Sequence, residues 1–344
     1  MKQPRAPIFN ARNLLWLAIG VCLALALLIG LFLSLDISLD TIVDQWAGVP
    51  LWGFVLLIGL NALIFGLSAF QWRITLAATS QADAPPPFSA LWFYTTMGAM
   101  LGQFIPVQFS ILLVRSAMLR MQRQATLTRG GSTSLLEQGI ALWVPLLLSF
   151  PGLAAISGEI GFLAWGVSSV GMLVFGWFLM LWIAPRLTKH LDPNTHARLW
   201  ALPGMRFIGP RLREIAEMNL FDPVILRTLF RLALVRFGLL AVRIMLFIYL
   251  LDLGLAFEKI LYIVPLGQVM LLFNLTPGNL GVREWTWVGL LTLSGIESDT
   301  AGSYMLAQRG LLFISLVITW LLTFLIHVGQ TRQRARSLVC EETA

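Results

Sequence analysis

Residues 260–296 read ILYIVPLGQVMLLFNLTPGNLGVREWTWVGLLTLSGI, an apolar segment that is interrupted at Thr276-Pro277-Gly278-Asn279-Leu280-Gly281. Each arm is about 12–17 residues long, shorter than the ~20 residues that a helix needs to cross a bilayer. Proline and glycine break the helical ladder, and broken backbone at membrane depth is tolerated only inside protein or beside a water-filled cavity. The segment therefore predicts a helical hairpin buried in a membrane protein. Residues 88–114, interrupted at Pro106, predict a second one.

The composition also indicates a membrane protein. Of the 344 residues, 58% are hydrophobic and 12% are charged, whereas soluble chains average roughly 45–50% and 25%. The mean hydropathy of +0.80 points the same way. A soluble enzyme, a disordered chain and a coiled coil are thereby excluded. The net charge of +7 is better explained by basic cytoplasmic loops than by a nucleic-acid partner.

Six apolar runs are long enough to be full spans. We therefore expect an all-α polytopic membrane protein with about six transmembrane helices and two re-entrant hairpins. These form a single domain, residues 14–328, between cytoplasmic tails 1–13 and 329–344. The alternative is that each interrupted segment forms two short full spans, which would leave the orientation unchanged. The six runs are residues 14–35, 51–70, 135–156, 161–184, 225–251 and 303–328.

The basic residues predict the orientation. The two tails and the loops 71–87, 115–134 and 185–224 carry 17 of the 24 lysines and arginines, and the opposite loops carry one, Lys259. Cytoplasmic loops of membrane proteins are enriched in Lys and Arg. We therefore expect a protein of the cytoplasmic (inner) membrane with both termini in the cytoplasm. The two hairpins then enter from opposite sides.

The two halves of the chain, about 14–184 and 185–328, contain similar motifs. Leu101-Gly102-Gln103 precedes Pro106 and Arg115, and Leu266-Gly267-Gln268 precedes Pro277 and Arg283. The first copy starts inside and the second starts outside, which is the arrangement of an inverted-repeat transporter with a midplane site. The alternative is chance similarity between apolar segments.

The stretch Pro277-Gly278-Asn279-Leu280-Gly281-Val282-Arg283-Glu284 resembles a signature of the flippase-like transmembrane domain of lysylphosphatidylglycerol synthases and its stand-alone relatives. All four fixed positions of that signature, Pro-Gly-x-x-Gly-x-x-Glu, are met. In the first half Pro106, Arg115 and Glu137 fit the family, while Val107-Gln108-Phe109-Ser110 replaces the usual glycines and Gln138 the usual arginine. The resemblance implies handling of anionic or polyprenyl-linked lipids. The soluble aminoacyl-transferase domain of the synthases is not expected here.

Ionisable side chains at membrane depth are costly and therefore need a reason. Arg236 and Arg243 are seven residues apart and share one helix face, and Arg binds phosphate in a bidentate manner. The alternatives are ion pairs: Arg283 with Glu284, or the helix arginines with Glu137 or Glu284. The candidate substrate-binding residues are Arg115, Glu137, Arg236, Arg243, Arg283, Glu284 and Arg309, and the candidate hairpin hinges are Pro106, Pro277, Gly278 and Gly281.

Two functions follow from these residues. The first is a translocase that moves a lipid with a phosphate headgroup across the membrane. The second is an integral-membrane transferase, or the partner subunit of a lipid-modifying enzyme, for which Glu137 is the plausible acid or base. Because nucleotide, hydrolase and metal-ligand motifs are missing from the sequence, we expect no cofactor, no metal and no enzymatic activity, and favour the translocase.

Overall fold

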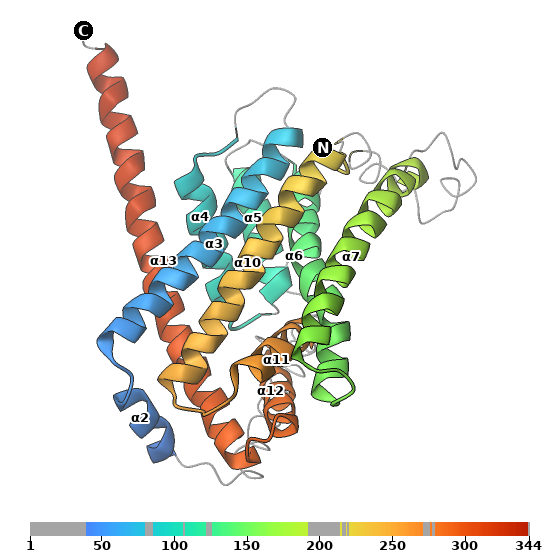
Figure 1. Cartoon of the computed structure of the whole chain (residues 1–344). Coiled ribbons are helices and arrows are strands. Elements are labelled where there is room, and N and C mark those ends of the chain that lie inside the picture. Colours follow the sequence, from blue (N-terminus) through green and yellow to red (C-terminus); the bar gives the residue numbers. More distant parts are fainter. Residues whose placement is uncertain are drawn as a thin grey trace, which may run out of the picture.

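The structure is a computed structural model, and long helices make up most of it (Figure 1). It describes residues 39–79, 85–105, 107–121, 126–191, 214, 218, 220–270, 276 and 279–342, and no strand occurs among them. Predicted span 14–35 lies outside the described residues, as do Pro106, Pro277 and Gly278.

Five helices are long and apolar enough to cross a membrane. They correspond to five of the six predicted spans, and they confirm an all-helical, multi-pass membrane protein. Most extend beyond the apolar runs, because a helix continues through polar residues wherever its backbone is satisfied. They are α3 (Leu51–Thr79), α6 (Leu127–Ile156), α7 (Phe162–Leu191), α10 (Pro223–Leu250) and α13 (Ser298–Glu342).

Helix α6 is the clearest example of such an extension. It begins at Leu127, eight residues before the expected start, because the Thr126 hydroxyl accepts a hydrogen bond from the Arg129 N–H (3.2 Å) and caps the first turn. Glu137 therefore lies ~15 Å along the helix from its first residue. Helix α6 packs against α3, α7, α10 and the short helix α5 (Val107–Met121), which makes it the central helix.

Each interrupted segment forms two short helices. The first consists of α4 (Phe88–Leu101) and α5 (Val107–Met121), and the second of α11 (Phe257–Val269) and α12 (Val282–Leu293). Figure 1 shows the first pair in the upper half of the bundle and the second pair in the lower half. The extensive contact between α11 and α6 joins the second pair to a helix of the first half of the chain.

A glycine allows the two short helices of each pair to pack closely. A Cβ on Gly98 would lie 2.9 Å from the Cα of Ile111, and a Cβ on Gly267 would lie 2.4 Å from Cζ2 of Trp287. Both distances are too short for a larger residue without rearrangement. The two broken regions therefore use the same packing device.

One described helix was not expected from the sequence. Residues Leu39–Ala47 form the short helix α2, where the apolar pattern predicted only an external loop. Nε1 of Trp46 donates a hydrogen bond to the carbonyl oxygen of Ala307 (2.9 Å), and α2 packs along α13. A short amphipathic helix is stabilised by such a contact rather than by its own length.

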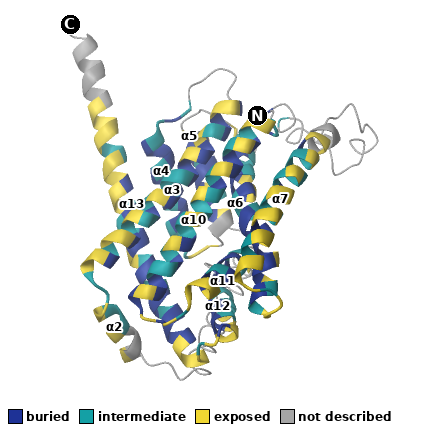
Figure 2. Ribbon diagram, in the orientation of Figure 1, coloured by how far each residue is buried: buried dark blue, intermediate teal, exposed yellow. Residues whose placement is uncertain are grey.

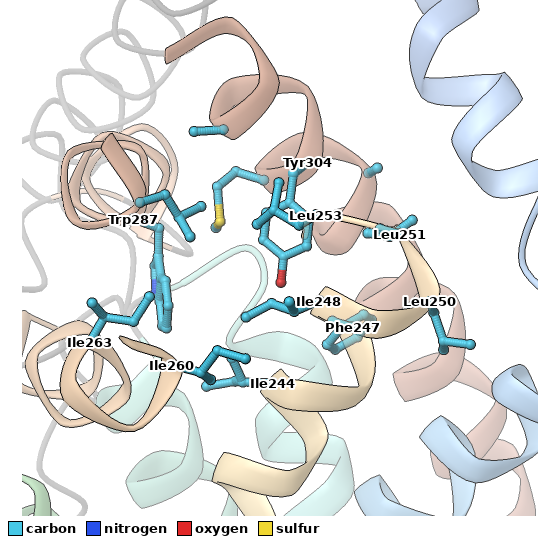
Figure 3. Close-up of a cluster of buried hydrophobic side chains, with 14 of the residues drawn as sticks. Ile244, Phe247, Ile248, Leu250, Leu251, Leu253, Ile260, Ile263, Trp287 and Tyr304 are labelled. Atoms are coloured by element: carbon cyan, nitrogen blue, oxygen red, sulfur yellow. The ribbon is translucent and has the colours of Figure 1, made fainter. Parts of the chain in front are cut away.

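Apolar side chains cover the outside of the bundle, and many polar side chains are inside. The exposed face of α7 includes Leu163 and Val167, which are 83% and 75% exposed (Figure 2). A buried apolar cluster from α10, α11, α12 and α13 includes Phe247, Trp287 and Tyr304 (Figure 3). This cluster holds the second hairpin in place.

Candidate functional site

A cavity of about 180 Å³ lies between the two hairpins and the long helices α3, α6, α10 and α13. A single ordered water needs only ~10–15 Å³, so the cavity has room for a chemical group as large as a phosphate. Most of its wall is apolar. The polar wall residues are the arginines Arg236, Arg243 and Arg283 and the amides Gln103, Gln138, Gln268 and Asn279.

Glu137 lies beside this cavity and is fully buried. Its Oε2 atom lies 2.6 Å from Nη1 of Arg115 on α5. Its Oε1 atom accepts hydrogen bonds from Arg236 on α10 and from the hydroxyl of Ser68 on α3 (2.9 Å). Two arginines thus share one carboxylate, and the three charged side chains together carry a net charge of +1. The pairing of Arg236 with Glu137, one of the alternatives from the sequence, is present.

Arg115 is held from all sides. Besides Glu137, it donates to Ser68 (2.8 Å), Thr95 (3.1 Å) and Ser134 (3.1 Å), and its guanidinium lies 4.7 Å from the ring centroid of Trp72. Satisfied hydrogen bonds are what make a buried charge tolerable. These contacts of Arg115 are all with other side chains of the protein, and it does not line the cavity. The structure therefore favours a role for Arg115 in holding α5 in position.

Glu284 forms the second buried ion pair. Its Oε1 atom accepts a hydrogen bond from Arg309 on α13, and its Oε2 atom accepts one from the backbone N–H of Gly281 (2.7 Å). Gly281 has φ +80°, a conformation that glycine adopts without steric cost. Glu284 therefore fixes the start of α12 and ties the second hairpin to α13.

The two ion pairs connect corresponding kinds of helix, but the acidic and basic residues have swapped places. In the first half, Arg115 on the second short helix pairs with Glu137 on the following long helix; in the second half, Glu284 on the second short helix pairs with Arg309 on the following long helix. The partners are 22 and 25 residues apart. Each pair of short helices is thus tied to the long helix that follows it in the sequence.

Two arginines on the cavity wall have N–H groups that find no acceptor among the described residues. Nη1 of Arg243 donates to Oδ1 of Asn61 (2.7 Å), but its buried Nε finds no hydrogen-bond acceptor in the described part of the chain. Arg283 forms neither a hydrogen bond nor an ion pair with any described residue. The predicted pair between Arg283 and Glu284 is therefore not formed among these residues. N–H groups of a guanidinium that have no acceptor among the described residues can bind an anion.

The structure thus separates the predicted site residues into two groups. Arg236, Arg243 and Arg283 meet at the cavity, and the expectation that Arg236 and Arg243 share one helix face is confirmed. The other four candidates, Arg115, Glu137, Glu284 and Arg309, are not among the residues that line this cavity, and they form ion pairs instead.

The amides of the wall were not among the site residues predicted from the sequence. Gln103 and Gln268 end the two Leu-Gly-Gln motifs and both line the cavity. The two similar motifs in the sequence were a signal for these residues, because a polar side chain that ends the same motif in two apolar segments suggests a shared polar environment. In the described part of the chain, no His, Cys, Asp or Glu side chains form a group of three that could hold a metal.

These features define a multi-pass membrane protein with a cationic cavity between two pairs of short helices. The family model described as the lysylphosphatidylglycerol synthase TM region matches residues 16–319, and the chain belongs to this family. Neither a curated protein nor a solved structure matches the chain.

Proposed function

We propose that the protein is a lipid translocase of the cytoplasmic membrane, which moves an anionic phospholipid or a polyprenyl-phosphate-linked lipid between the leaflets. The observation that carries this proposal is the cavity with three arginines on its wall. The headgroup phosphate would bind these guanidinium groups while the lipid tails stay in the bilayer. Membership of a family named after a lipid synthase TM region supports a lipid as the partner.

The proposed architecture is an inverted repeat with two opposed re-entrant hairpins. It is supported by the two pairs of short helices at opposite ends of the bundle (Figure 1), by the glycines that pack them and by the exchanged ion pairs. A site between such broken helices is typical of transporters that alternate access between two sides. The arginine-poor external loops support cytoplasmic termini.

A transferase is less well supported. It would use Glu137 as its acid or base, but this carboxylate is fully buried and accepts hydrogen bonds from three side chains. A carboxylate whose two oxygens are occupied by these donors is not accessible to a substrate. The geometry therefore favours the translocase.

The test is lipid movement in vesicles that contain only the purified protein. A fluorescent anionic phospholipid should move between leaflets much faster with the protein than without it. Arg243→Gln and Arg283→Gln should each slow this movement about ten- to hundredfold, the loss expected for one charge-assisted hydrogen bond. The matched control is Arg231→Gln, because Arg231 is on the same helix as Arg243 but exposed and away from the cavity.

Two results would contradict the proposal. One is a wild-type protein that moves no lipid above the rate in empty vesicles. The other is full activity in the well-folded double variant Arg243→Gln/Arg283→Gln, because the phosphate would then have to bind elsewhere.

A further inference from the structure

The charges on and beside the cavity wall do not balance. Within the described residues, the cavity wall and the two ion pairs beside it contain five arginines and only two glutamates, which leaves a net charge of +3. Uncompensated charge at membrane depth is costly. A ligand that brings a single negative charge would leave most of this excess in place.

The two carboxylates are not available to a ligand. Glu137 is occupied by Arg115, Arg236 and Ser68, and Glu284 by Arg309 and the N–H of Gly281. Neither lines the cavity, and the described wall residues include no Asp or Glu. An ammonium group inside the cavity would therefore meet three arginines and find only amide oxygens as acceptors.

The N–H groups of Arg243 and Arg283 that have no acceptor among the described residues favour a negatively charged group instead. Arg243 and Arg283 come from α10 and α12, so their guanidinium groups reach the cavity from different sides. Arg presents a fork of N–H donors that matches the oxygens of phosphate. Two such forks, with Arg236 on the same wall, can contact several oxygens of one phosphate or of two linked phosphates.

We infer that the headgroup carries at least two negative charges and no amine, as in a phosphate monoester or a diphosphate. This inference rests on the proposed function and narrows its substrate class. The inferred substrate class excludes lysylphosphatidylglycerol, the lipid after which the family is named. A lysyl ester adds two ammonium groups to a single phosphate and makes the headgroup cationic. The cavity repels that headgroup and attracts a lipid phosphate.

The first test compares lipids with the same acyl chains and different headgroups in vesicles with the wild-type protein. Phosphatidic acid, a monoester, should move about ten- to hundredfold faster than phosphatidylglycerol. Lysylphosphatidylglycerol and phosphatidylcholine should move no faster than in empty vesicles. Equal rates for lysylphosphatidylglycerol and phosphatidic acid would overturn the inference but leave the translocase intact, whereas no movement of any lipid would refute the translocase itself.

A pH series on the same vesicles supplies a second readout. The second pKa of a phosphate monoester is ~6, so phosphatidic acid gains its second negative charge as the pH rises through this value. Its rate of movement should increase between about pH 5 and pH 7.5, while the rate for singly charged phosphatidylglycerol stays level. A phosphatidic acid rate that falls over this range would contradict the need for two charges.

The second test changes the charge of the wall. Gln268→Glu adds one carboxylate to the cavity, and Gln103→Glu does so from the equivalent place on the first hairpin. Each should slow phosphatidic acid about tenfold or more and raise lysylphosphatidylglycerol movement above that in empty vesicles. Gln268→Leu, which removes the amide without adding charge, separates the effect of charge from the loss of a hydrogen bond.

The ratio of the phosphatidic acid rate to the lysylphosphatidylglycerol rate is the deciding quantity. If either folded glutamate variant keeps the wild-type ratio, charge does not select the headgroup and the inference is wrong. The comparison of headgroups on the wild-type protein stands even if both variants fail to fold.

Discussion

Among single residues, Glu137 is the carboxylate that pairs with the largest number of arginines in the described part of the chain. It accepts hydrogen bonds from Arg115, Arg236 and Ser68, whereas loss of Arg115 alone would leave the pair between Glu137 and Arg236 in place. Breaking a buried pair costs ~3–5 kcal/mol when a charge is left without a partner. The two members of this ion pair should therefore not be equivalent.

We expect Glu137→Gln to destabilise the protein more than Arg115→Gln does, because it leaves two arginines without an anion. The loss for Glu137→Gln should be ~3–5 kcal/mol or more, measured as thermal unfolding in detergent with and without added lipid. The control is Arg120→Gln on the same helix as Arg115, because Arg120 is exposed. Equal losses for both variants would show that Arg236 does not share this carboxylate.

Arg283 and Glu284 are adjacent in sequence but differ in what they contact. We expect Arg283→Gln to keep wild-type stability within about 0.5 kcal/mol, because no described residue pairs with it. Glu284→Gln should lose ~3–5 kcal/mol, because it breaks the buried ion pair with Arg309 and weakens the contact that fixes Gly281. Thermal unfolding measures both. A large loss for Arg283→Gln would mean that its guanidinium is structural.

At the scale of elements, packing inside the second hairpin depends on Gly267. We expect Gly267→Ala to destabilise the protein by ~1–3 kcal/mol, as overpacking does, because its Cβ would lie 2.4 Å from the ring of Trp287. The control is Gly289→Ala on α12, where a Cβ meets nothing within 4 Å. That variant should be neutral or gain up to ~1 kcal/mol from helix propensity.

The same pair of variants checks the link between the hairpin and the site. Gly267 is the neighbour of the wall residue Gln268, so a shift of α11 against α12 should also slow lipid movement. If Gly267→Ala matches Gly289→Ala in both unfolding temperature and activity, the close approach of α11 and α12 is wrong.

At the scale of the whole molecule, the orientation is testable by labelling. After Cys22 and Cys340 are replaced by serine, single cysteines at Glu159 and Ser298 should react with a membrane-impermeant reagent on intact cells. Cysteines at Met121 and Arg332, both exposed, should react only after the cells are made permeable. This follows from the 17-to-1 distribution of basic residues between the two sides. Labelling of Met121→Cys on intact cells would show that the first hairpin has the opposite orientation.

The bundle as a whole explains why many elements are predictable. The bilayer requires about 20 apolar residues per span and excludes broken backbone from lipid, so hydropathy alone marked five helices and both interruptions before the fold was known. Element ends and α2 were not predictable in this way. They depend on a cap at Thr126 and on a contact between Trp46 and α13.

Composition and the spacing of apolar residues are local properties of the chain, so they were enough to predict the class of protein, the places where its helices break and the arginines within apolar segments. Only the tertiary structure decided which charge meets which. Arg236 finds Glu137 across 99 residues, and that contact depends on how two long helices are rotated and packed. Arg283 and Glu284 point in different directions because successive helix positions are ~100° apart, so one faces the cavity and the other faces Arg309.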